Sequence, residues 1–424
     1  MRLLAVMFLL AAGLAAQEQD SLDWDINTIF NEPPEEAPAG ETLQEPRPST
    51  AEVPVSRMLQ RRGFVFDASF RFNVGVAPGW RELPWDQKWD DKNYYLDRYI
   101  RMRNSFSIDA QISESFRVLS TVFFEIPGFR IQLGDFFFDY RLYDTVFFRG
   151  GKYNHSWGIS PNYGFSNLLS RVPAEGYALD PFIFKADVPI GKGGIQLLTL
   201  TRFDLMGSSA NLPKWEDFGV GGKYNLALPW ADLDAGIFYQ DGMALRGFLS
   251  VKTTLWDTEL YNEWLGAIDV HEPSNVSGAF NVGFEREFFS GKFSVNGELF
   301  YNAEKDTYWY EPETNIREAR TSLFVEGFNM AVNLSYRPWD RFDLRLFFRT
   351  LYAPMEHSAQ VVPGLRLRPW PNVELSLAVP MGLGRSDGYY HKNTVTVTSQ
   401  NEPLPFAVIF MVTLNGGVRF RHSY

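Results

Sequence analysis

The segment Gly63–Val76 reads GFVFDASFRFNVGV and has a period of two. Its even-numbered positions are apolar or aromatic, whereas the odd-numbered positions between them include Asp67 and Arg71. A period of two predicts a β-strand, because successive side chains of a strand point to opposite faces. One face here is apolar enough for lipid and the other carries ionised groups. This combination is typical of a membrane barrel with a wet interior.

The same alternation continues almost to the end of the chain. It predicts eighteen strands, near residues 63–76, 99–112, 115–126, 129–142, 145–153, 181–190, 194–206, 217–228, 232–241, 243–255, 258–269, 278–289, 292–303, 320–337, 341–352, 359–368, 373–380 and 405–422. We therefore expect an all-β, antiparallel transmembrane barrel over residues 63–424. Sixteen strands is the alternative count, and a water-soluble sandwich or propeller is the alternative fold.

The connections between these strands alternate between short and long. Long loops are expected at 77–98, 154–180, 207–216, 304–319 and 381–404. Four of the eight short turns contain tryptophan, at Trp230, Trp256, Trp339 and Trp370, which indicates an aromatic girdle at one membrane interface. Because an even number of strands returns the chain to its starting side, we expect both ends of the barrel in the periplasm.

The composition supports an exported barrel. The chain has 37 Phe, 19 Tyr and 12 Trp, yet its mean hydropathy is −0.21, which suits alternating strands better than a water-soluble core. Its longest apolar run is shorter than the ~18 residues of a membrane-spanning helix. The absence of cysteine excludes disulfides, thiolate metal ligands and an N-terminus modified with lipid at cysteine.

The N-terminal region reads as a leader followed by a polar arm. Residues 1–16 have the basic start, apolar core and small-residue exit of a signal peptide. Residues 17–62 are proline-rich, and the stretch 17–60 alone carries a charge of −8 out of the net −11, so we expect a disordered acidic periplasmic arm. Its apolar island at 22–30 is either a docking site for a periplasmic partner or a sticky patch in a linker.

The last strand carries the one class-level resemblance. Phe406, Val408, Phe410, Val412 and Leu414 alternate above Phe420, and the chain ends at Tyr424. An apolar final strand ending in an aromatic residue resembles the assembly signal of outer-membrane barrels, including porin-like proteins of Gram-negative bacteria and spirochaetes. The resemblance implies the outer membrane of a diderm bacterium, with membrane lipid and the barrel-assembly machinery as partners.

The loop after the fifth predicted strand, at 154–180, resembles in position and length the loop that narrows the lumen of general diffusion porins. The resemblance implies that Glu175 and Asp180 face arginines across a constriction. An extracellular packing loop is the alternative.

Parity places several charged residues on the wet face of the wall, where water or partner groups reach them. The candidate pore-lining residues are Arg101, Arg103, Arg117, Arg202, Arg345, Arg349 and Asp343. Their excess of positive charge predicts a weak anion preference.

A barrel of this strand number leaves an aqueous lumen unless something fills it, which predicts a channel for passive diffusion of small hydrophilic solutes. A non-conducting surface receptor or adhesin is the main alternative. A barrel enzyme is the weaker one, because no histidine has a serine two residues away on the same strand face. We expect no catalytic residues, cofactor, metal site or nucleic-acid partner.

Overall fold

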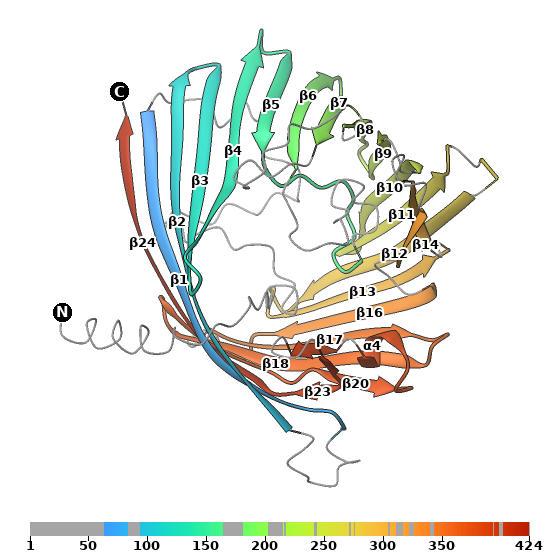
Figure 1. The fold of residues 1–424 in the computed structure, drawn as a ribbon. Coiled ribbons are helices and arrows are strands. Elements are labelled where there is room, and N and C mark those ends of the chain that lie inside the picture. The colour runs from blue at the N-terminus through green and yellow to red at the C-terminus, as the bar shows by residue number, and fades with distance from the viewer. Residues whose placement is uncertain are drawn as a thin grey trace.

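The computed structural model describes residues 63–83, 94–163, 181–201, 215, 218–240, 244–270, 273–274, 276–303, 306–310, 317–321, 326–339, 343–392, 394–397 and 402–423. These residues form a closed antiparallel β-barrel (Figure 1). The predicted signal peptide at 1–16, the arm at 17–62 and its island at 22–30 lie outside this description, so they remain predictions.

The first half of the wall consists of nine strands. They are β1 (Gly63–Trp80), β2 (Tyr94–Ser113), β3 (Phe116–Ile126), β4 (Arg130–Leu142), β5 (Val146–Lys152), β6 (Phe182–Ile190), β7 (Gly193–Thr201), β8 (Gly219–Ala227) and β9 (Asp232–Gln240). The second half continues with β10 (Leu245–Leu255), β11 (Thr258–Ile268), β12 (Val276–Phe288), β13 (Phe293–Asn302), β16 (Gly327–Tyr336), β17 (Asp343–Ala353), β18 (Ser358–Trp370), β19 (Val373–Ala378), β20 (Met381–Gly384), β23 (Phe406–Ala407) and β24 (Ile409–Ser423).

The wall has eighteen strands because two of them are interrupted. β19 and β20 both pair with β18, one after the other, and therefore make one wall strand. β23 and β24 both pair with β1 in the same way. The pairing of β1 with β24, from Gly63 opposite Ser423 to Val76 opposite Phe410, closes the barrel. The predicted fold and the predicted count of eighteen are confirmed.

The long-loop side differs in detail from the prediction. β1 and β2 extend to Trp80 and from Tyr94, so their connection is shorter than the predicted loop 77–98. The strand predicted at 320–337 is divided between β15 (Arg317–Thr321), which pairs with β14 (Asp306–Tyr310), and the wall strand β16. The loop after β20 carries a short helix, α4 (Tyr389–Lys392), and the pair β21 (Val395–Val397) and β22 (Glu402–Leu404).

No helix among the described residues is long and apolar enough to cross a membrane.

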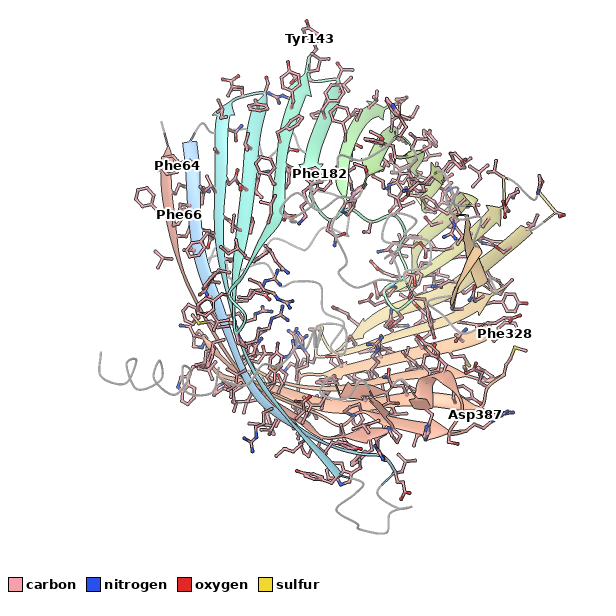
Figure 2. The ribbon with its side chains drawn as sticks, in the orientation of Figure 1. Phe64, Phe66, Tyr143, Phe182, Phe328 and Asp387 are labelled. Carbon is pink, nitrogen blue, oxygen red and sulfur yellow. The ribbon has the colours of Figure 1, made fainter. Side chains whose placement is uncertain are left out.

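The two faces of the wall have different chemistry. Phe66, Phe70 and Val74 are exposed on the outside of β1, and Phe64 and Phe66 project from this side of the barrel in Figure 2. By alternation, the odd-numbered residues of β1 face the lumen. On β4, Phe136 and Phe138 are likewise exposed outside, while Phe137 between them and Asp139 after them are buried on the inside. An apolar outer surface and an ionised inner surface suit a barrel in lipid.

Candidate functional site: the barrel lumen

The chain turns into the lumen after β5. We call residues 154–163 the lumen segment; in Figure 1 the trace that follows β5 runs across the inside of the barrel toward β11, β12 and β13. Of the two alternatives for the loop after the fifth strand, the described part of the loop therefore favours the one that folds inward.

Two buried carboxylates of the wall hold the middle of the lumen segment. Glu263 of β11 accepts hydrogen bonds from the backbone N–H groups of Ile159 (2.5 Å) and Ser160 (3.2 Å). Glu298 of β13 accepts from the Ser160 hydroxyl at 3.2 Å and from the Asn162 N–H at 3.3 Å. A carboxylate is tolerated in a buried position when its oxygens accept hydrogen bonds. The carboxylates of the wall and the donor groups of the lumen segment therefore satisfy each other's hydrogen-bonding requirements.

Amides on neighbouring strands extend this contact. The side chain of Asn162 donates to Asn296 of β13 (2.6 Å) and accepts from Asn333 of β16 (2.5 Å). The Asn281 amide of β12 donates to the Ser160 hydroxyl at 2.9 Å. The segment is thus bonded to strands β11, β12, β13 and β16, which fixes its position over this part of the inner wall.

Aromatic packing holds the first part of the segment. Trp157 is buried, donates its Nε1–H to Gln196 of β7 (2.7 Å) and packs against Phe248 of β10 at 5.7 Å between ring centroids. His155 lies 3.0 Å from the same Gln196 amide oxygen. A buried indole with a satisfied N–H contributes both apolar area and orientation.

The far end of the segment meets the loop after β20. Tyr163 stacks on Phe300 of β13 at 4.7 Å between ring centroids, and its phenol lies beside that of Tyr390 of α4. Tyr390 donates to Asn329 of β16 (3.0 Å). Burial raises the pKa of both phenols, which therefore remain neutral hydrogen-bonding groups at physiological pH. Arg349 of β17 lies beside this pair and interacts electrostatically with both phenols.

The wall from β17 through β24 and β1 to β5 is rich in arginine. In Figure 2, side-chain nitrogen atoms gather on the inner side of this wall. The lumen-facing charged residues include Arg71, Arg101, Arg103, Arg117, Arg149, Arg345, Arg349, Arg366, Arg368 and Arg419, with the acids Asp67, Asp109, Glu125, Asp139, Asp343 and Glu374. The arginines outnumber the acids in this list. We call this part of the wall the arginine arc.

Ion pairs fix many of these arginines. Arg101 and Arg103 both approach Glu125, at 2.8 and 3.4 Å, and the Arg103 guanidinium also covers the Phe123 ring. Arg117 pairs with Asp109 at 2.7 Å and approaches Asp139 at 3.5 Å.

The three candidates of β17 differ in their surroundings. Asp343 approaches Arg368 of β18 at 3.7 Å, and Arg345 lies opposite Arg366 of the same strand. Arg349 lies under the junction of the lumen segment with α4 instead. The strand pairings put the described candidates on one face of the wall, and their role in lining a pore stays a prediction. Arg202, Glu175 and Asp180 lie outside the described residues.

Sequence reasoning missed the role of Glu263. It is not among the residues predicted from the sequence, and the backbone groups that it binds are more than a hundred residues away in the chain. The signal was an acid in a strand whose other inward positions, Tyr261 and Leu265, are large and buried. Such an acid requires buried donors, and a loop inside the lumen supplies them.

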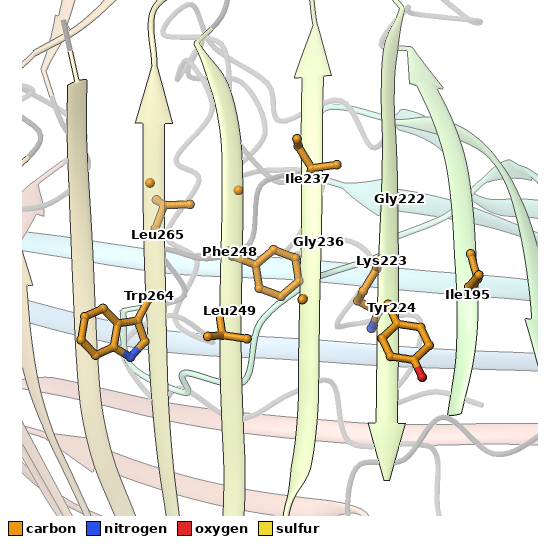
Figure 3. Close-up of a pocket in the computed structure, with 13 residues that line it drawn as sticks. Ile195, Gly222, Lys223, Tyr224, Gly236, Ile237, Phe248, Leu249, Trp264 and Leu265 are labelled. Carbon is orange, nitrogen blue, oxygen red and sulfur yellow. The ribbon is translucent and has the colours of Figure 1, made fainter. Parts of the chain in front are cut away.

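An apolar depression of about 890 Å³ lies on the opposite face of the wall, over β7 to β11 (Figure 3). Its rim includes the exposed side chains of Tyr224, Leu249 and Trp264, with glycines such as Gly247 and Gly266 between them. Since these side chains belong to the outer surface, the depression faces lipid and is separate from the lumen.

The chain matches no protein-family model, and no curated protein matches its sequence. Solved structures match its fold. OccK3 (OpdO) of Pseudomonas aeruginosa has a TM-score of 0.54 and 12% identity over 84% of this chain and 96% of its own. OccAB4 of Acinetobacter baumannii has a TM-score of 0.53 and 9% identity over 85% of this chain and 100% of its own. OpdQ of P. aeruginosa has a TM-score of 0.53 and 8% identity over 84% and 98%.

These neighbours are outer-membrane porins. The likeness establishes the fold, and the predicted resemblance to porin-like barrels is confirmed at this level. The chain therefore forms an outer-membrane type of barrel, in agreement with the predicted location.

Proposed function

We propose that the protein is an outer-membrane channel for the passive diffusion of small hydrophilic solutes, with a weak preference for anions. The observation that carries the proposal is the lumen segment. It enters a closed barrel, is bonded to one side of the inner wall through Glu263 and Glu298, and leaves the arginine arc, apart from Arg349, on the other side. A wall lined with charge and narrowed by an inserted loop is a sieve for hydrated solutes.

The anion preference follows from which charges a solute can reach. Glu263 and Glu298 are buried under the lumen segment, with their oxygens already accepting hydrogen bonds. On the arginine arc, by contrast, the side chains of Arg103 and Arg419 are 41% and 55% exposed, and Asp343, an acid of the arc that is 51% exposed, approaches Arg368. A permeating ion therefore meets more accessible positive than negative charge, which favours anions.

Reversal potentials across a KCl gradient test this proposal. We expect a small anion selectivity in the parent protein that decreases when Arg345 and Arg349 are both changed to serine. Arg385→Ser is the control, because Arg385 is an exposed arginine of the loop after β20 that pairs with Asp387 at 2.6 Å. Cation selectivity in the parent protein, or an unchanged potential in the double variant, would contradict the assignment of Arg345 and Arg349 to the selective region.

The two alternative functions, a non-conducting receptor and a channel, require the same barrel wall. They differ in whether solutes and ions pass through the lumen. Liposome swelling separates them and also gives the size limit. We expect small sugars and amino acids to enter vesicles that contain the protein, and larger oligosaccharides to be excluded. Vesicles that admit none of these solutes would favour the receptor.

A further inference from the structure

Two pairs of arginines lie directly opposite each other on the inner wall. Arg71 of β1 is opposite Arg103 of β2, and Arg345 of β17 is opposite Arg366 of β18. Like charges directly opposite on neighbouring strands repel each other and destabilise the sheet. An anionic group beside such a pair removes the repulsion. The arginine arc is therefore a surface that suits an anionic partner.

The acids of the arc neutralise these arginines only in part. Glu125 and Glu374 are each shared by two arginines, with nitrogen–oxygen distances between 2.8 and 3.4 Å. In each of these groups one negative charge faces two positive charges. An excess of positive charge that lines a low-dielectric wall attracts anions into the lumen.

Exposed arginines continue the arc to the end of the barrel where the chain enters the wall. Arg419 and Arg421 of β24 are exposed and lie opposite Asp67 and Val65, close to the start of β1. Arg419 pairs with Asp67 at 2.9 Å. Within the part of the chain that the structure describes, Arg421 forms no ion pair or hydrogen bond. This end of the arc therefore offers positive charge that an anionic segment can reach.

The predicted acidic arm joins the wall at this end. β1 starts at Gly63, opposite Gln111 and beside the short turn that joins β2 to β3. Before it, residues 53–62 carry three arginines and no acid, whereas residues 18–52 carry ten acids and a single base, Arg47. The acidic stretch is thus separated from the wall by a spacer of ten residues.

The spacer is long enough for the acids to reach the arc. Arg419 lies opposite Asp67, which is four residues from Gly63 and hence about 14 Å along the strand. A flexible chain from Glu52 to Gly63 has an end-to-end distance of roughly 20 Å. Length and charge therefore both allow the acidic stretch to lie on the arc.

We propose that the acidic arm, residues 17–62, enters the lumen from the short-turn side and binds to the arginine arc, with its carboxylates beside Arg71, Arg419 and Arg421. The arm then competes with permeating anions and acts as a reversible blocker that the chain itself carries. The effect on current rests on the proposed function, whereas the contact between arm and wall requires no ion flow. A periplasmic partner that holds the arm outside the barrel is the alternative.

Single-channel recording of full-length variants tests the effect on current. The triple variant Glu41→Gln, Glu45→Gln and Glu52→Gln keeps the length of the arm and removes three negative charges. We expect it to lose most of the brief closures of the parent channel and to show a stronger anion selectivity. Arg47→Gln makes the arm more negative, so it should lengthen the closures. Closures and selectivity that stay unchanged in both variants of a conducting parent would overturn the blocking role.

A distance measurement tests the contact itself, even in a protein that does not conduct. The chain has no cysteine, so Glu45→Cys can be combined with Ser69→Cys or with Ser294→Cys, and each pair labelled with nitroxides in lipid vesicles. Ser69 lies between Asp67 and Arg71 on the inner face of β1, and Ser294 lies on the inner face of β13, away from the arc.

We expect electron–electron distance measurements to give a short, defined distance from position 45 to position 69, and a longer one from 45 to 294. The short distance should broaden in 1 M KCl, because salt at this concentration screens the ion pairs. Equally long and broad distances for the two pairs, or a short distance that salt does not change, would show that the arm does not bind the arc through charge.

The two measurements also separate this proposal from the proposed function. A parent protein without current steps contradicts the channel, and the distances then decide alone whether the arm binds the arc. A conducting parent whose two label pairs give the same distances retains the channel and excludes the bound arm.

Discussion

Two adjacent glycines of β8 show how a single residue position affects the packing of the lumen segment against the wall. Gly221 faces inward, where an added Cβ would lie 2.9 Å from the buried Trp157 ring and 2.9 Å from the Ile237 carbonyl oxygen. Gly222 faces outward, and its nearest neighbour would be the Leu197 side chain at 3.4 Å. The first glycine is therefore required for the lumen segment to approach the wall, and the second is not.

We expect Gly221→Ala to destabilise the folded barrel by about 1–3 kcal/mol, because overpacking displaces Trp157 or separates β8 from β9. Gly222→Ala, on the same strand, should change the free energy of unfolding by less than about 0.5 kcal/mol. Urea unfolding gives both values, and the near-ultraviolet circular dichroism of the indole reports the displacement. Equal effects of the two variants would show that Trp157 does not pack against Gly221.

At the scale of elements, the strands could be predicted from the sequence, whereas the position of the lumen segment could not. Strands follow a local rule, so the period of two predicted the count of eighteen, although β20 (Met381–Gly384) continues a strand that was predicted to end at residue 380. The position of the lumen segment depends on Glu263, Glu298 and Asn333, which reach it only when the barrel closes. The alternation marked inward side chains but did not indicate which of them accept a loop.

Glu263→Ala tests the attachment of this segment. The change leaves the N–H groups of Ile159 and Ser160 buried without their acceptor, and hydrogen bonds to a charged group contribute about 1.5–3 kcal/mol each. We therefore expect a looser segment, seen as larger fluctuations of single-channel current. Glu263→Gln, which keeps one acceptor oxygen, should have a smaller effect.

Glu259→Ala is the matched control for this prediction. Glu259 lies on the same strand and faces the same side, but it pairs with Lys252 at 2.8 Å. Its current trace should match that of the parent protein. If the current fluctuations of Glu263→Ala are no larger than those of Glu259→Ala, the Glu263 carboxylate does not hold the lumen segment in place.

The whole molecule combines a closed wall with a lumen that is divided by charge. In the described part of the chain, the pairing of β1 with β24 leaves the barrel wall without a free edge, and the apolar outer face meets lipid while the arginine arc meets water. The lumen segment covers the side of the wall that carries Glu263 and Glu298, and exposed arginines of the arc such as Arg103 lie on the other side. This arrangement supports the proposed channel.

Single-channel recording of the purified full-length protein in a planar lipid bilayer tests this account most directly. The account predicts discrete, stable current steps in KCl at both polarities of the applied voltage. A folded protein, shown to be inserted by circular dichroism and protease protection of the same preparation in vesicles, that gives no current steps at any salt concentration or voltage would contradict the account.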